Sequence, residues 1–177
     1  MTLCIAATCQ LNKNPTIIHC TDRRADLGYA GSADNLPKMK EIGKSWMLSM
    51  ASSNWTVSDH LVGHIQGCFL AASQAPKQVD ELKKLISDGI AAFSNSGEYK
   101  NADTELLVSG YLDATIPTII NVTLNGKKSA LSIIGEFAGS IGHGQYIAKV
   151  FLAQREYSVY DDLETALYKI YEAKKYG

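Results

Sequence analysis

Several features that would assign this 177-residue chain to a specialised class are missing. No run approaches the roughly 18 consecutive apolar residues of a membrane-spanning helix, so we expect no membrane span. The N-terminus has no basic segment before an apolar one, so we expect no signal peptide. The formal net charge is only −1, which gives no electrostatic reason to expect binding to nucleic acid or to an anionic membrane.

Cysteine is scarce, and its four positions show no spacing typical of a metal or redox site. The four are Cys4, Cys9, Cys20 and Cys68, and they include no Cys-x-x-Cys pair. The first three lie in predicted strands, where free cysteine behaves as a small hydrophobe. A reduced, cytoplasmic protein is the simplest interpretation. The length suits a single domain, residues 1–177, and a composition of 46% hydrophobic and 20% charged residues is that of a soluble globular protein.

Hydrophobic periodicity predicts two groups of strands, each followed by two helices. The predicted strands are Leu3–Cys9, Thr16–Thr21, Pro37–Ile42, Trp46–Ala51, Glu105–Leu112, Ile116–Leu124 and Ser129–Ile134. The predicted helices cover about 54–73, Pro76–Phe93, about 144–157, and a last one after a capping box at 158–161. Ser53 and Asn54 offer caps for the first of them. Residues 139–144 are predicted to be a glycine-containing loop. Two stacked antiparallel sheets with helices on both outer faces would bury all the apolar stripes, which predicts an α+β fold, a four-layer αββα sandwich.

The last predicted helix has a clear two-sided pattern. Its buried side is predicted to carry Leu163, Ala166, Leu167, Ile170 and Tyr171. Its three lysines are predicted to lie on a solvated face: Lys169, Lys174 and Lys175. Elsewhere, His19 is predicted to be a core residue.

The most informative feature is the charged segment Asp22-Arg23-Arg24 together with Thr2. Asp22 follows an apolar run, and Lys38 begins another short apolar run. Removal of Met1 would leave Thr2 with its hydroxyl and its α-amine on one residue, and that amine can act as the base for the hydroxyl. A nearby Lys38 ammonium, held by Asp22, would lower the pKa of the amine below its reference value of about 7.7–8.0.

These residues resemble the active-site pattern of proteasome β subunits and their bacterial relatives, the N-terminal-nucleophile (Ntn) threonine peptidases. The resemblance rests on Thr2, Asp22-Arg23-Arg24-Ala25 and Lys38, and it continues in the family's order through 47–53, 105–111 and 141–144. It implies the same αββα fold and a threonine-type endopeptidase acting on peptides or unfolded proteins in protein catabolism. It also implies a homo-oligomeric ring or helical stack, is compatible with an ATPase partner, and requires no metal or organic cofactor.

The resemblance also implies a role for each residue that matches the pattern. Thr2 would be the nucleophile and its own α-amine the general base. Asp22 and Lys38 would set the charge and protonation of the site, and Arg24 would brace Asp22 or the adjacent loop. The site therefore depends on three groups that are far apart in the sequence.

The chain departs from the family's pattern at three points. Ser52 stands where many members have glycine, but its backbone N–H can still stabilise an oxyanion. His143 stands in place of a serine that hydrogen-bonds near the terminal threonine, so His143 is either a hydrogen-bonding or proton-handling group or a loop residue. Members usually continue through an aspartate and further strands after the point matching Gly177, so the chain either lacks these or is truncated.

Several alternative functions stay open at this stage. If Met1 is retained, Thr2 has no free amine, and the chain would be a catalytically silent scaffold or assembly protein of the same fold. A non-peptide amidase acting on small amides would use the same groups. His60 and His64 have a metal-ligand spacing, but Leu61 stands where the zinc-peptidase motif needs Glu. Residues 139–144 precede a helix but lack the lysine of a phosphate-binding loop.

Overall fold

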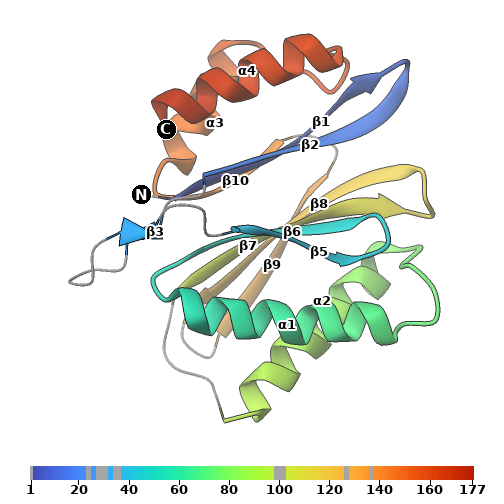
Figure 1. The fold of residues 1–177 in the computed structure, drawn as a ribbon. Coiled ribbons are helices and arrows are strands. Elements are labelled where there is room, and N and C mark those ends of the chain that lie inside the picture. Colours follow the sequence, from blue (N-terminus) through green and yellow to red (C-terminus); the bar gives the residue numbers. More distant parts are fainter. Residues whose placement is uncertain are drawn as a thin grey trace.

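Two antiparallel β-sheets lie face to face, and a pair of helices covers the outer face of each sheet (Figure 1). The computed structural model describes residues 2–22, 25–26, 32–33, 37–97, 103–125, 128–135 and 138–177. The layers run helix, sheet, sheet, helix. The predicted four-layer αββα sandwich is therefore confirmed.

The first sheet has the strand order β10-β1-β2 and lies beneath two helices. Its elements are β1 (Leu3–Leu11), β2 (Asn14–Thr21), β10 (Ala138–Gly142), α3 (Gln145–Gln154) and α4 (Leu163–Tyr176). Strand β1 is buried on both faces because it lies between the helix pair and the second sheet, and its side chains alternate between these two sides. One set packs under the two helices: Leu3, Ile5, Ala7 and Cys9. The other set faces the second sheet.

The second sheet has the order β5-β6-β7-β8-β9 and is covered by the other helix pair. Its elements are β5 (Met39–Gly43), β6 (Trp46–Ser52), β7 (Thr104–Leu112), β8 (Ile116–Asn125), β9 (Lys128–Gly135), α1 (Trp55–Ala71) and α2 (Val79–Asn95). A small ribbon pairs β3 (Ala25–Asp26) with β4 (Ser32–Ala33). The largest hydrophobic cluster lies between this second sheet and its helices, with Trp46, Ile65 and Phe93 among its buried members.

The layer between the two sheets combines small and larger apolar side chains. Its buried apolar members are Cys4, Ala6, Ala51, Leu107, Ile119 and Ile141. Alanine and cysteine at three of the positions let β1 and β6 approach closely, since the distance between packed sheets follows the size of the side chains between them. The start of β1 is thereby held against the end of β6.

Two helix caps fix where helices begin beside the sheets. Asn54 caps α1 by accepting a hydrogen bond from the Val57 N–H at 3.2 Å, as its sequence predicted. Asp162 caps α4 by accepting from the Thr165 N–H at 2.8 Å, and this bond lowers the pKa of the Asp162 carboxyl. The predicted capping box at 158–161 was therefore placed too early.

Two predictions about the C-terminal third were wrong. Residues 138–142 form strand β10 rather than a loop, because their backbone pairs with β1 from Leu3 to Ala7. On α4, Ala166 and Ile170 are buried as predicted, but Leu167 and Tyr171 are exposed by 46% and 65%, and Ala173 completes the buried side. The small alanines let α4 lie close to the first sheet, and the bulkier residues face outward. None of the described helices has the length and apolar character needed to cross a bilayer.

The crossing of α1 and α2 depends on a glycine. A Cβ atom at Gly89 would lie 2.6 Å from the Ile65 Cα on α1, closer than backbone atoms allow. We therefore expect Gly89→Ala to lower the free energy of unfolding by about 1–3 kcal/mol, because the two helices must separate. Urea unfolding followed by circular dichroism measures the change.

Gly67→Ala is the matched control, because a Cβ atom at that α1 position would meet no atom within 4 Å. This substitution should raise the stability by up to about 1 kcal/mol through helix propensity alone. Equal effects of the two substitutions would show that the helices are not in close contact at Gly89.

Candidate active site

Three polar groups that are distant in sequence meet where the first sheet begins. Strand pairing sets Cys4 opposite Thr21, so Asp22 follows directly beside the start of β1. The Leu3 N–H donates to Asp22 Oδ2 at 2.9 Å. Lys38 Nζ forms an ion pair with Asp22 Oδ1 and donates to Thr2 Oγ1 at 2.7 Å. The threonine hydroxyl, the carboxylate and the ammonium therefore lie in one hydrogen-bonded cluster.

The Lys38 ammonium is the most buried charge of this cluster. Its side chain is 3% exposed, whereas that of Asp22 is 19% exposed. A buried ammonium is strongly destabilising unless a carboxylate and hydrogen-bond acceptors replace the lost water. Asp22 and Thr2 are acceptors of this kind, so the cluster supplies what burial of Lys38 requires.

A second ammonium reaches Asp22 from the outer helix layer. Lys174 Nζ on α4 lies 3.5 Å from Asp22 Oδ2, and its side chain is 21% exposed. The prediction that Lys174 lies on a solvated face was therefore wrong. Lys169 is likewise 16% exposed and pairs with Asp161. The helical spacing could not reveal these contacts, because they depend on how α4 lies over the first sheet.

The backbone of Thr2 is held by the turn between β10 and α3. The His143 N–H donates to the Thr2 carbonyl oxygen at 2.9 Å. Gly142 makes this approach feasible, since its φ is +93° and a Cβ atom there would lie 2.0 Å from the Thr2 carbonyl oxygen. The turn therefore fixes the residue that carries the hydroxyl.

Glu105 braces this turn and was not identified from the sequence. Its carboxylate accepts from the Gly142 N–H at 2.7 Å and from Gln145 Nε2 at 3.0 Å. The residue lies at the start of β7, where a strand motif was recognised but no side-chain role was inferred. Only the pairing of distant strands brings Glu105 to Gly142.

Ser52 ends β6 and has its hydroxyl engaged at the junction with α1. Its Oγ bonds with Thr104 Oγ1 at 3.0 Å and accepts from the Asn54 N–H at 3.0 Å. The Met50 N–H donates to the Lys38 carbonyl oxygen on the β5 side. Because N–H directions repeat every second residue along a strand, the Ser52 N–H points to that same side. The Ser52 hydroxyl therefore stabilises the junction between β6 and α1, whereas the Ser52 N–H points towards the side of β6 on which Lys38 lies.

The two remaining predicted site residues are His143 and Arg24. The His143 side chain is exposed, and its backbone N–H is the group that contacts Thr2. Arg24 lies outside the described residues. The proposed roles of both side chains stay predictions.

The Cys4 thiol, two residues after Thr2, is an unreactive group. Cys4 is fully buried, and its Sγ lies 3.6 Å from the Met50 carbonyl oxygen. Burial, with a smaller contribution from the Asp22 carboxylate, raises the pKa of the Cys4 thiol to about 12. The thiolate is therefore disfavoured, and the partly exposed Thr2 hydroxyl is the nucleophilic group beside Lys38.

Histidines elsewhere form no metal site within the described part of the chain. His60 and His64 lie one turn apart on α1, and His64 makes an edge contact with the Phe93 ring. No three His, Cys, Asp or Glu side chains gather among the residues with assigned structure. His19 lies between the sheets, with Nδ1 at 3.2 Å from Ser49 Oγ and Nε2 bonded to Ser109 Oγ.

The architecture is shared with solved structures of very different sequence. The sequence matches no model of a known protein family and no curated protein. A Gly-1 mutant of Anbu from Hyphomicrobium sp. strain MC1 has a TM-score of 0.73 at 15% identity, over 99% of this chain and 74% of that one. Anbu from Pseudomonas aeruginosa, described as a helical assembly, has a TM-score of 0.67 at 16% identity, over 99% and 74%.

A third similar structure is the eukaryotic HslV from Trypanosoma brucei. It has a TM-score of 0.59 at 13% identity, over 99% of this chain and 89% of that one. At such low identity the likeness concerns the fold alone. The chain thus has the proteasome-like sandwich fold of the Anbu and HslV structures.

The partly buried position of His19 between the sheets predicts a specific loss of stability in acid. Burial lowers the pKa of His19 from 6.5 to about 4, so the folded state binds a proton less readily than the unfolded state. The resulting stability is complete above about pH 6.5 and falls as the pH drops towards 4, by up to about 3 kcal/mol. Urea unfolding at a series of pH values measures this slope.

His19→Gln is the comparison, because glutamine keeps polar groups that do not titrate in this range. The difference in unfolding free energy between the wild type and this variant should shrink as the pH falls from 6.5 to 4. A difference that stays constant over that range would show that His19 is not held in its neutral form.

Proposed function

We propose that this protein is a threonine-type endopeptidase whose nucleophile is Thr2 after removal of Met1. The observation that carries the proposal is the 2.7 Å hydrogen bond from the buried Lys38 ammonium to Thr2 Oγ1. A free Thr2 amine would lie on the same residue as the attacking oxygen, as the N-terminal-nucleophile mechanism requires.

The first half of the reaction transfers the acyl group of the substrate to Thr2. The α-amine takes the proton from Oγ1, and the oxygen attacks the carbonyl carbon of the scissile peptide bond. Lys38 stabilises the negative charge that develops on Oγ1, and Asp22 holds the ammonium in position. The new ester bond forms as the C–N bond breaks, and the proton passes from the α-amine to the departing amine.

The second half hydrolyses the ester. The α-amine accepts a proton from a water molecule, the water oxygen attacks the ester carbonyl, and the proton returns to Thr2 Oγ1. In both halves the carbonyl oxygen becomes negative, and the Ser52 N–H is the donor assigned to it. The net reaction is the addition of one water molecule across a peptide bond, with an unfolded protein or peptide as the substrate class.

We also propose that the chain works as a homo-oligomer. The similar Anbu structure from Pseudomonas aeruginosa is described as a helical assembly, which supports a ring or stack of copies. Exposed apolar side chains on α3 and α4, such as Tyr146 and Tyr171, are suitable for contacts between copies. The single-domain organisation and an ATPase partner stay predictions.

The direct test is the intact mass of the protein isolated from its native source. We expect a mass that lacks Met1. After incubation with a peptide epoxyketone or vinyl sulfone, the mass should increase by that of one covalently bound inhibitor molecule. Peptide mapping should locate that adduct on Thr2. Retention of Met1 in nearly all molecules would favour a scaffold of the same fold, and turnover of small amides without extended peptides would favour an amidase.

Adduct formation by variants of Thr2 and Lys38 tests the proposed chemical roles of these two residues. Thr2→Ser should keep an adduct, because serine retains the hydroxyl and the amine. Thr2→Val has nearly the shape of threonine but no hydroxyl, and should give none. Lys38→Met should reduce the adduct rate by at least 100-fold, on the scale of losing one charge-stabilising donor. An unchanged rate in Lys38→Met would contradict the proposed role.

A further inference from the structure

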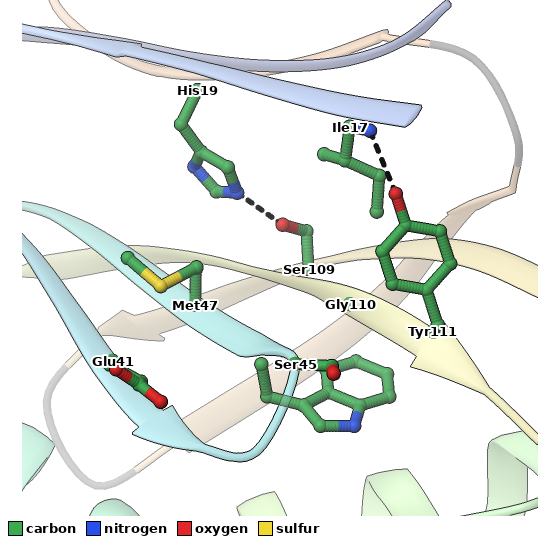
Figure 2. Close-up of a pocket in the computed structure, with 9 residues that line it drawn as sticks. Ile17, His19, Glu41, Ser45, Met47, Ser109, Gly110 and Tyr111 are labelled. Atoms are coloured by element: carbon green, nitrogen blue, oxygen red, sulfur yellow. Dashed lines mark hydrogen bonds between the residues drawn. The ribbon is translucent and has the colours of Figure 1, made fainter. Parts of the chain in front are cut away.

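A cavity lies between the two sheets, away from Thr2 (Figure 2). Its volume is about 250 Å³, and it is formed by β2 on one side and by β5, β6 and β7 on the other. The cavity residues of β2 pair with Ala6 and Thr8 of β1, four and six residues beyond Thr2. At about 3.3 Å per residue, the cavity is about 13–20 Å from Thr2 along the strand.

The inner end of the cavity is polar but uncharged. Figure 2 shows His19 pointing down from β2 to Ser109 on β7, with a hydrogen bond between them. Since burial keeps His19 neutral, this pair carries no charge at neutral pH. A serine hydroxyl can take part in three hydrogen bonds, and among the described residues Ser109 Oγ makes the one with His19. A hydrogen-bonding position therefore remains at this end.

The walls are apolar and held in place. Ile17 and Met47 face the cavity from the two sheets, and Tyr111 spans the gap between the sheets (Figure 2). The Tyr111 hydroxyl accepts from the Ile17 N–H at 3.1 Å and donates to the Pro15 carbonyl oxygen at 3.3 Å. The cavity is thus bounded by a fixed aromatic ring, which makes it a preformed space.

Glu41 supplies a carboxylate at the mouth of the cavity. Glu41 and Ser45 are both exposed cavity residues, so they mark the side that opens to solvent. No ion pair or side-chain hydrogen bond engages the Glu41 carboxylate within the described ranges, and the neighbouring Lys40 pairs with Asp59 instead. A charged group of opposite sign could therefore pair with Glu41 at the rim.

We propose that this cavity binds a small amphipathic amine, whose apolar body lies between Ile17, Met47 and Tyr111 and whose ammonium group pairs with Glu41 at the mouth. The volume lies just below the roughly 300–1,000 Å³ of typical ligand pockets, so the ligand must be small. The ammonium faces outward because the neutral His19 and Ser109 offer no countercharge inside. The site goes beyond the proposed peptidase activity and uses none of its residues.

The test uses three probes that have the same phenyl group and three-carbon chain but differ in the charge of the terminal group: 3-phenylpropylamine, 3-phenylpropan-1-ol and 3-phenylpropanoate. Each is titrated into the full chain, and the methyl resonances of Met47 and Ile17 are followed by NMR. We expect saturable shifts of both methyl groups. The amine should bind about threefold more tightly than the alcohol and about tenfold more tightly than the carboxylate, the range of a partly exposed ion pair.

Two variants check the location and the charge preference. Glu41→Gln should abolish the preference for the amine over the alcohol and leave the affinity for the alcohol unchanged. Ile17→Trp should weaken all three probes at least tenfold by filling the cavity, with thermal unfolding as the control for folding. If Ile17→Trp does not fold, the loss or persistence of the amine preference in Glu41→Gln still tests the proposed ion pair.

Three results would overturn the proposal. The first is the absence of saturable shifts at Met47 and Ile17 with all three probes at millimolar concentration. The second is a carboxylate that binds wild type as tightly as the amine. The third is a preference for the amine that survives in Glu41→Gln.

Discussion

Burial of the Lys38 ammonium is the constraint on which the candidate site depends. A lysine at 3% exposure is stable only where carboxylate and hydroxyl oxygens replace water, and Asp22 and Thr2 provide them. The same contact directs a positive charge at the Thr2 hydroxyl. One interaction therefore explains both the stability of this corner and the chemistry proposed for it.

The sandwich brings these groups together by backbone pairing and by small side chains. The pairing of β1 with β2 sets Asp22 beside Thr2, and the pairing of β5 with β6 brings Lys38 in from the other sheet. Alanine and cysteine between the sheets allow that approach. Further along β2 and β7, His19 and Tyr111 reach across between the sheets and border the cavity. Strand pairing and the side chains between the sheets thus position both sites.

The sequence predicts the layers well because strands and helices follow simple periods. Alternation in β1 and the Asn54 cap of α1 are local signals, and both were read correctly. Strand β10 was missed because its glycines and small residues show no alternation. Glu105 and Lys174 were missed as site residues because their contacts join distant segments. Local patterns therefore predict elements, whereas the supporting contacts of the site depend on three-dimensional packing.

The most direct test of the central interaction is a double-mutant cycle on Asp22 and Lys38, measured as unfolding free energies in urea. Asp22→Asn should destabilise the protein by about 3 kcal/mol, because it removes the countercharge of the buried Lys38 ammonium. Lys38→Met should destabilise it by less, because Lys174 still lies 3.5 Å from the Asp22 carboxylate. The double variant should lose at least about 1 kcal/mol less than the sum of the two single losses. Additivity within about 0.5 kcal/mol would contradict the account, because independent residues behave in that way.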